Sequence, residues 1–469
     1  MERVLVEADR VAQDFAPDPV HDLRVALRRC RSLAEGIQAI DPDPAWKKMR
    51  KVGKALFGSL GTLRDCHVLA EWTQKLGAAD DPITAGLLEY CRLQELDLRR
   101  HAEQALDEFD RKRWQAWARS LPRRAARLRL GSEPFQSLAL ERWTQARRLE
   151  GPALKTGGRP EAFHRLRIGL KKFRYVVENF LPEQHQQWSG GLKRVQDALG
   201  EIHDLDVLLE TVERLGVLNS VETQVRWRQR IADERDARVE QYRREMEGKE
   251  GISLWQVWRQ GLPRGAEARS AAFKKIRSWA SFLDPDVRHS RLVARLALQL
   301  YDDLARIGVL GEDHGHQREL LQAAAVVHEV GRSTGKKGHH KSTRQLVQHL
   351  ERPFPWSRQD LAVVAFVARY HRGSLPGKAQ PGFRSLPTPV RPLAQRLAGI
   401  LRLANAFDAD HKGKIQRIKV SKPGPFLVIH ADGFNGHGDL AEGIAGARYL
   451  LELSLRLPIA VRPMPRSTK

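Results

Sequence analysis

The sequence predicts a mainly α-helical protein, and three features of the chain point to this fold class. Long stretches rich in Leu, Ala, Glu, Arg and Gln carry apolar residues three and four positions apart, the spacing that gives a helix one buried face. Proline and glycine punctuate these stretches rather than interrupt them. Two short motifs each occur twice in the first half, in the same order. We therefore expect a duplicated helical region followed by a second helical domain with a small β-hairpin.

The duplication rests on two pairs of motifs. Residues 21–31, HDLRVALRRCR, and residues 164–174, HRLRIGLKKFR, share the pattern H-x-x-R-x-x-x-[RK]-[RK]-x-R. Residues 60–68, LGTLRDCHV, follow the first copy, and residues 199–207, LGEIHDLDV, follow the second. Two motif pairs in the same order predict two related helical units. The expected breaks between helices are DPDP at 41–44, GP at 151–152 and LP at 181–182.

Each copy of the first motif places a row of cations on one face of a helix. At 100° per residue, four of its side chains fall within an arc of about 80°, with apolar residues on the other side. A solvated charged face is the alternative interpretation, but like charges one turn apart are unfavourable without an anion. Their spacing of roughly 5.4 Å suits a linear polyanion with closely spaced phosphates. The first cation row is His21, Arg24, Arg28 and Arg31, the second is His164, Arg167, Lys171 and Arg174, and the following helices add Lys51, Lys54, Lys193 and Arg194.

The overall composition is consistent with an anionic partner. The 469-residue chain has 80 Lys and Arg against 57 Asp and Glu, a formal net charge of +23, which suits nucleic acid, acidic lipid or another polyanion. No run of 18 apolar residues and no signal peptide is found, so we expect no membrane partner. The three cysteines lack metal-site spacing and are odd in number, which argues against a disulfide scaffold or a Cys-rich zinc site and favours the cytoplasm.

The motifs of the first half resemble the CHAD domain, the conserved histidine α-helical domain, over residues 1–265. The resemblance implies two four-helix bundles, about 1–130 and 135–265, related by a pseudo-twofold axis. It also implies a basic channel or surface that binds inorganic polyphosphate, with Lys172 joining the two cation rows and their neighbours as binding residues. One position departs from the family pattern, because His67 stands where the second copy has an acid.

A second domain is expected over residues 280–469, where histidines and carboxylates stand at the ends of apolar helices. Neutral imidazoles and carboxylates bind divalent metals, and a bound metal activates water for attack on phosphate. A single histidine at a helix end is more often a cap, but an ordered set favours a site for Mn, Mg, Fe or Zn. The candidate ligands are His289, His328, Glu329, His340, His371 and Asp408, and the candidate phosphate-orienting residues are Arg332, Lys336, Lys337, Lys341 and Arg372.

Three segments of this second domain, GHHKS, YHRGSLP and RLAGILRLANAFDADH, resemble the C-terminal HD-like domain of the exopolyphosphatase/guanosine pentaphosphatase (Ppx/GppA) family. The pair at 328–329 is His-Glu rather than the His-Asp of the HD superfamily. The sequence contains no counterpart of the actin-like ATPase domains that carry catalysis in Ppx/GppA enzymes, and residues 331–338 do not match a P-loop. The resemblance therefore implies recognition of polyphosphate or a phosphorylated nucleotide more directly than hydrolysis.

Near the end of the chain, residues 415–420 and 426–431 are β-like runs separated by SKPGP, which predict a hairpin. A helix over 439–456 and a short strand, LPIAVR, are expected to follow. Taken together, the sequence predicts a bacterial-type polyphosphate-binding protein. Its expected location is the cytoplasm, where association with polyphosphate granules is one option. A metal-dependent phosphohydrolase acting on polyphosphate or a phosphorylated nucleotide is the first alternative. A nucleic-acid binder is the second, although no helix-turn-helix, zinc-finger, RRM or KH signature is found.

Overall fold

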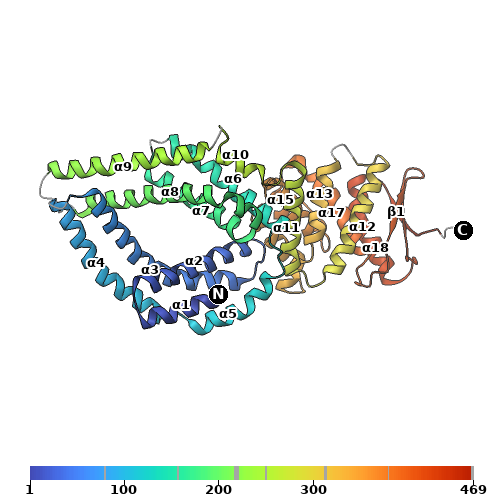
Figure 1. Ribbon diagram of the computed structural model, residues 1–469. Helices are drawn as coiled ribbons and strands as arrows, with labels where there is room; N and C mark the ends of the chain where they lie inside the picture. The colour runs from blue at the N-terminus through green and yellow to red at the C-terminus, as the bar shows by residue number, and fades with distance from the viewer. Residues whose placement is uncertain are drawn as a thin grey trace. The chain divides into compact units, whose positions relative to one another are not determined.

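The computed structural model describes residues 1–78, 81–155, 158–215, 221–248, 251–310, 314–378 and 380–465. Within these residues the protein is mainly α-helical with one small sheet, so the predicted fold class is confirmed (Figure 1). The chain divides into two compact units, unit 1 (Met1–Gly265) and unit 2 (Ala266–Lys469). No helix among the described residues combines the length and the apolar character needed to cross a bilayer.

Unit 1 contains two successive sets of helices. In each set the long helices pack on their neighbours along the chain, α2 on α3 and α3 on α4, then α7 on α8 and α8 on α9. The two sets meet where α2 packs against α7 and α3 packs against α8. The first set is α1 (Glu2–Gln13), α2 (Pro17–Gln38), α3 (Pro44–Leu76), α4 (Pro82–Asp107) and α5 (Arg111–Ala125), and the second is α6 (Glu133–Lys155), α7 (Pro160–Phe180), α8 (Pro182–Leu215), α9 (Val221–Glu247) and α10 (Leu254–Gln260).

Proline and aspartate mark several of these helix starts. Asp43 accepts a hydrogen bond from the backbone N–H of Ala45 at 2.8 Å, and Pro44 occupies the first helical position of α3. Two of the three expected breaks fall between helices, DPDP between α2 and α3 and LP between α7 and α8. The third prediction was wrong, because GP at 151–152 lies inside α6. Buried neighbours on both sides of Pro152, Glu150 and Ala153, anchor the last turn of α6 against the cost of the missing N–H.

A third repeated motif lies at the end of each helix set. The motif is W-Q-x-W, at 114–117 in α5 and at 255–258 in α10. All four tryptophans are buried, and the ring centroids within each pair are 6.4 Å and 5.2 Å apart. Each set therefore carries the same tryptophan pair in its core, which supports the duplication independently of the basic motifs.

Unit 2 is built around four packed helices, α12, α13, α15 and α17. Leucine and valine side chains such as Leu296, Leu321, Val367 and Leu401 are fully buried among them, each contributing roughly 1.5–3 kcal/mol of transfer free energy. The helices of unit 2 are α11 (Gly265–Leu283), α12 (Val287–Arg306), α13 (His314–Val327), η1 (Val330–Thr334), α14 (His339–Gln348), α15 (Arg358–Arg369), α16 (Pro381–Arg384), η2 (Thr388–Val390), α17 (Arg391–Ala406) and α18 (Gly438–Leu455).

The sheet of unit 2 has three strands in the order β1 (Ile418–Ser421), β2 (Leu427–Ala431), β3 (Ile459–Pro463). Strands β1 and β2 form the expected antiparallel hairpin, with Ile418 opposite Ala431. Strand β3 adds to β2 in parallel, after the crossover helix α18. The sheet packs on α12, so the hairpin closes one side of the helical core.

Candidate polyanion and metal sites

The two cation rows lie on helices that pack against each other, α2 and α7. Their contact is close because Gly36 faces the Phe180 ring, and a β-carbon at Gly36 would overlap that ring. One turn earlier, the Asn179 side-chain amide donates a hydrogen bond to the Ser32 hydroxyl at 3.1 Å. The rows therefore approach each other from the two sides of a tight helix crossing.

Lys171 is the residue at which the two rows come together. It lies near Arg167 of its own helix and near Arg24, Arg28 and Arg31 of α2. Burial and the positive charge of these arginines lower the pKa of Lys171 to about 8. A cavity of about 220 Å³ is lined by cations from both helices, namely Arg28, Arg29, Arg167, Lys171 and Arg174.

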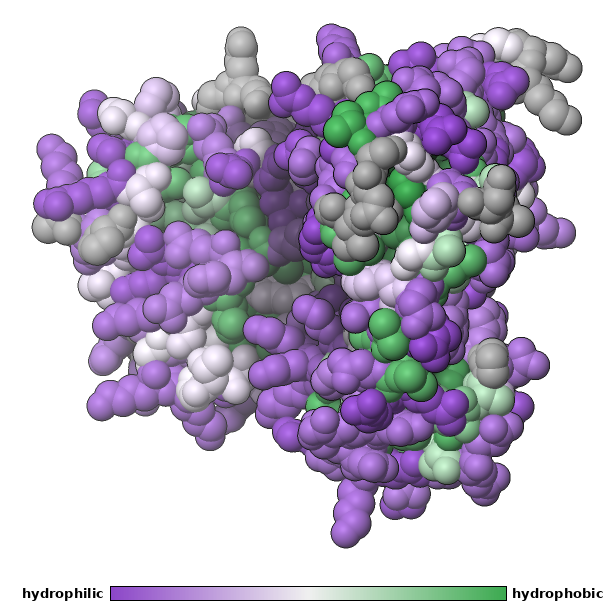
Figure 2. Space-filling view, turned by 90° about the vertical axis from the view of Figure 1, so that its left-hand side faces the viewer, coloured by the Kyte–Doolittle hydropathy of each residue, from purple (hydrophilic) through white to green (hydrophobic). Residues whose placement is uncertain are grey.

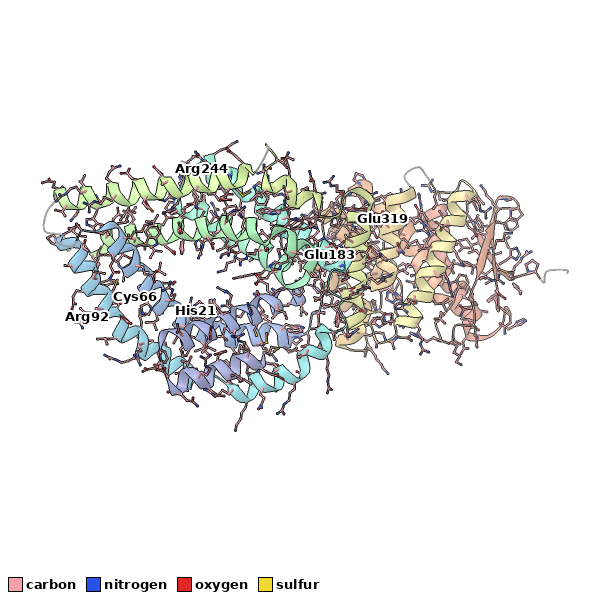
Figure 3. The ribbon with its side chains drawn as sticks, in the orientation of Figure 1. His21, Cys66, Arg92, Glu183, Arg244 and Glu319 are labelled. Atoms are coloured by element: carbon pink, nitrogen blue, oxygen red, sulfur yellow. The ribbon has the colours of Figure 1, made fainter. Side chains whose placement is uncertain are left out.

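The surface of unit 1 is hollowed at one end. Figure 2, which views unit 1 from one end, shows a hollow between two lobes, with both hydrophilic and hydrophobic residues on its wall. His21, labelled in Figure 3, is exposed on α2. A second cavity, of about 320 Å³, is lined by His21 and Arg24 together with Arg64 and Arg99.

Aromatic and amide groups hold the arginines in place. The ring of Phe57 on α3 lies 5.2 Å from the guanidinium of Arg24 and 4.7 Å from that of Arg31, within the range of cation–π attraction. At the equivalent position of the second copy, Gln196 on α8 accepts a hydrogen bond from Arg174 at 2.7 Å. Sequence reasoning missed both residues, because neither belongs to the basic motifs.

A carboxylate from each copy lies beneath the rows. Asp65 in LGTLRDCHV and Asp204 in LGEIHDLDV occupy the same motif position and influence each other electrostatically. Burial raises the pKa of Asp65 above its usual value, although Arg24 and Lys171 oppose the rise. Burial also raises the pKa of Asp204, to about 6, against the opposing effect of Arg167. Two further carboxylates, Glu178 and Asp197, line the cavity at the crossing with its five cations and offset part of their charge.

The departure at His67 is a coordinated change of two residues. The His67 Nε2 atom lies 3.0 Å from a carboxylate oxygen of Glu95 on α4. In the second copy, Asp206 stands at the position of His67 and accepts from Arg235 of α9 at 2.6 Å. The inter-helix contact is therefore kept in both copies, with histidine facing an acid in one and an acid facing arginine in the other.

The remaining predicted polyphosphate ligands are more peripheral. Arg194 forms an ion pair with Glu245 at 2.7 Å, and Lys172 lies 3.9 Å from Glu35. His164 is exposed, with its ring centroid 5.0 Å from that of His203. Three further predicted ligands are exposed and are not among the residues that line the cavity at the crossing: Lys51, Lys54 and Lys193.

In unit 2, three buried histidines are oriented in the same way. The Nδ1 atom of each lies within hydrogen-bonding distance of the backbone carbonyl three residues earlier. A ring whose Nδ1–H donates to a carbonyl presents the lone pair of Nε2 on its other side. The pairs are His328 with Ala325 (2.7 Å), His339 with Lys336 (3.1 Å) and His371 with Ala368 (2.7 Å).

The three Nε2 atoms surround one oxygen of Glu329. Glu329 Oε1 lies 3.0 Å from Nε2 of His339, 3.4 Å from that of His371 and 3.9 Å from that of His328. We call these four residues the histidine–glutamate cluster, and each is at most 4% exposed. Lone pairs that face one another at such distances repel unless a cation or proton lies among them. Ligand atoms bound to one metal at 2.0–2.2 Å are themselves separated by about 3 Å, so the cluster fits a divalent metal.

The protonation states favour the same interpretation. Burial lowers the pKa of His328 to about 3, and burial also lowers the pKa of His371, so both rings are neutral near pH 7. The guanidinium of Arg332, which donates to the other oxygen of Glu329 at 3.0 Å, favours the ionised carboxylate. Neutral imidazoles around an ionised carboxylate form a donor set for Mn, Fe or Zn.

His289 extends the cluster, and Asp408 orients the His289 ring. The Nε2 atom of His289 lies 3.4 Å from that of His328, while its Nδ1 atom lies 2.8 Å from Asp408 Oδ2. The other oxygen of Asp408 accepts the backbone N–H of Gly413 at 2.7 Å. Asp408 thus stands behind His289 as a positioning carboxylate. Two buried triads result, His289–His328–Glu329 and Glu329–His339–His371, which share Glu329.

Of the two neighbouring histidines, the structure brings His339 rather than His340 into the cluster. The His340 ring is partly exposed, with its centroid 6.4 Å from that of His371. Successive side chains on a helix point 100° apart, so only one of the pair faces inward, and α14 begins at His339 after a left-handed Gly338. Sequence reasoning also missed Thr343, which donates to the His328 carbonyl and accepts the N–H of Gly331, both at 3.0 Å.

The predicted phosphate-orienting residues lie around this cluster. Arg332 donates to the second oxygen of Glu329 at 3.0 Å, so it is tied to the cluster itself. The other four have exposed side chains on the neighbouring loops and on α14: Lys336, Lys337, Lys341 and Arg372.

Comparison with protein families identifies both units. The model of the CHAD domain matches residues 1–213, and the model described as Ppx/GppA phosphatase, domain III matches residues 274–424. No curated protein matches the chain. The protein therefore combines a CHAD domain with a C-terminal Ppx/GppA-type domain, which confirms both resemblances and connects the chain with polyphosphate.

Proposed function

We propose that unit 1 binds inorganic polyphosphate along the surface where the two cation rows meet. The observation that carries this proposal is the position of Lys171, half-buried among arginines of both α2 and α7. So many cations at one crossing repel one another in the absence of an anion. The Nη1 atom of Arg24 is also buried without a hydrogen-bond partner among the described residues. A chain of phosphates supplies both the negative charge and the acceptor oxygens.

Removing one cation from each row tests this proposal. Replacement of Arg28 and Lys171 by glutamine should weaken polyphosphate binding at moderate salt by about tenfold or more, because each lost contact is a charge-assisted hydrogen bond. The slope of log affinity against log salt should also become shallower. The matched control is Arg92→Gln with Arg244→Gln, two exposed arginines on α4 and α9 (Figure 3). An unchanged affinity and an unchanged slope in the Arg28/Lys171 variant would reject the proposal.

A competition experiment separates polyphosphate from nucleic acid. Duplex DNA and polyphosphate are offered at equal phosphate concentration and moderate salt, and displacement of labelled polyphosphate is measured. The proposal expects weak displacement, because the cations converge on a narrow crossing instead of spreading over a groove-reading surface. Efficient displacement by duplex DNA would favour the nucleic-acid alternative.

As a second candidate function, we propose that unit 2 is a metal-dependent phosphohydrolase acting on polyphosphate or a phosphorylated nucleotide. The convergence of three imidazole Nε2 atoms on Glu329 supports it. A divalent metal, when bound, would polarise a phosphoryl oxygen and lower the pKa of a coordinated water. His328, His339, His371 and Glu329 would hold the metal, and Asp408 would keep His289 directed toward it.

Metal content and phosphate release test this second candidate together. Purified protein is analysed for Mn, Fe, Zn and Mg and is then assayed for phosphate release from long-chain polyphosphate. Replacing His328 by alanine and Glu329 by glutamine should remove both the metal and the release, whereas His340→Ala should keep them. Metal-free protein that gains neither metal nor activity on addition of Mn or Mg would leave unit 2 as a binding domain.

A further inference from the structure

Helix α12 carries a third row of cations, which the motif analysis did not single out. Arg288, Arg291 and Arg295 are three and four residues apart, so they fall within an arc of about 60° on one helix face. All three side chains are exposed. They extend over about 10 Å along the helix axis, at 1.5 Å per residue.

This arginine row lies on a groove that reaches the metal site. A cavity of about 640 Å³ is lined by the three arginines and by Lys412, and its wall also includes His289 and Asp408. The groove therefore begins at exposed cations and ends at the histidine that contacts His328.

The two acids in the groove, Asp286 and Asp408, offset only part of the charge of the four cations that line it. Asp286 accepts from the His411 ring at 2.8 Å and from the backbone N–H of His289 at 3.2 Å. Asp408 uses both oxygens for His289 and Gly413. Within the described residues, Arg288 and Arg291 form no ion pair, and Arg295 donates to the neutral amide of Gln416.

We propose that the α12 groove binds a chain of linked phosphates and directs its end toward His289. The inference rests on the second candidate function and specifies how its substrate would be held. Cations in a line suit a linear polyanion, and Leu292 is the one aliphatic side chain in the cavity wall, which includes no Phe, Tyr or Trp against which a nucleobase could stack. The shared chemistry is the phosphate chain, which an inorganic polyphosphate or the phosphate tail of a nucleotide supplies.

The test uses full-length protein in which the unit 1 surface is already weakened by Arg28→Gln and Lys171→Gln. Binding of tripolyphosphate is measured by calorimetry in EDTA, so that the readout does not depend on metal or turnover. Adding Arg291→Gln and Arg295→Gln should weaken the remaining binding by about tenfold or more, because two charge-assisted contacts are lost. The matched control adds Lys419→Gln and Lys422→Gln, two exposed lysines that are not among the residues lining the groove, and should leave the affinity unchanged.

The outcomes separate this inference from the proposed functions. Residual binding that is insensitive to the Arg291/Arg295 changes would overturn the groove assignment. A lack of effect of Arg28→Gln and Lys171→Gln would instead reject the unit 1 proposal. The comparison of the Arg291/Arg295 variant with its Lys419/Lys422 control would still test the groove.

In a second experiment, a nucleoside triphosphate competes with tripolyphosphate for the groove. Equal competition supports the groove and assigns it to a phosphate chain of either source, and stronger competition by tripolyphosphate assigns it to the inorganic polymer.

Discussion

The proton on Lys171 couples polyphosphate binding to pH. With its pKa lowered to about 8, Lys171 loses its charge in the free protein as the pH rises from 7 to 9. Affinity for polyphosphate should therefore fall over this range, by up to about tenfold per pH unit above 8 if the charged form is required. Lys171→Arg keeps the charge and should remove this fall, as measured by binding titrations at several pH values. A pH profile identical in the two proteins would contradict the role of Lys171.

The same shift sets the sign of a stability effect in the absence of ligand. The folded-state pKa of Lys171 lies below the ordinary value of 10.5, so the unfolded chain binds this proton more tightly between about pH 8 and pH 10.5. The contribution of Lys171 to the free energy of unfolding therefore increases with pH across that window. Urea unfolding measures the free energy of unfolding of the wild type and of Lys171→Met at pH 7 and pH 9. The difference in this free energy between the two proteins should be smaller at pH 9.

Within the cluster of unit 2, neighbouring residues have separable roles. His339→Ala removes an Nε2 atom 3.0 Å from Glu329 Oε1 and should abolish high-affinity metal binding. Asp408→Asn keeps the size of the residue that orients His289 and should lower metal affinity by about 10–100-fold, the usual cost of losing such a partner. Titration of the apo protein with Zn²⁺ or Mn²⁺ checks both. His340→Ala is the control, and a loss of metal in that variant would contradict the assignment.

At the scale of single residues, the sequence predicts part of the candidate metal site of unit 2. The order of histidines along the chain indicates a convergent set, because several of them follow apolar helices. It does not distinguish His339 from His340, since the choice depends on where α14 begins. It also leaves the role of Asp408 open, because a ligand and an orienting carboxylate have the same residue type and differ only in what each oxygen contacts.

At the scale of elements, the crossing of α2 and α7 depends on Gly36. Gly36→Val would push a branched side chain into the Phe180 ring and should lower the free energy of unfolding by about 1–3 kcal/mol. Combining it with Phe180→Ala should cost less than the sum of the two single changes, because the second change makes room for the first. Urea unfolding of the four proteins measures the coupling. Strict additivity would show that the crossing tolerates separation of the helices.

The helices themselves follow from local sequence, whereas the helices on which they pack do not. Periodicity and proline positions predict α2, α3, α7 and α8, because the spacing of apolar residues within each segment defines its apolar face. The meeting of the two cation rows depends on contacts between residues more than a hundred positions apart, such as Ser32 with Asn179. The break expected at 151–152 failed for a related reason, since buried neighbours hold α6 together around Pro152.

At the scale of the whole molecule, two proposed polyanion sites on one chain predict a dependence on polymer length. A polyphosphate long enough to occupy both sites should bind more tightly than tripolyphosphate by more than the statistical factor, because the second contact is intramolecular. Neutralising either the Arg28/Lys171 pair or the Arg291/Arg295 pair should remove most of this gain. Affinities for short and long chains, compared at one salt concentration, test the prediction. A length dependence that survives in both variants would exclude joint binding.

The exchanged contact between the third and fourth helices of each copy bears on how the duplicated halves diverged. One copy has Asp206 with Arg235, and the other has His67 with Glu95. A direct passage between two opposite charge patterns goes through a mismatched pair, either two acids or two bases. Histidine removes that obstacle, because its neutral ring is compatible with either an arginine or a glutamate opposite. A stepwise history, one substitution at a time, is thus open to this pair in either direction, through an intermediate that combines histidine with arginine.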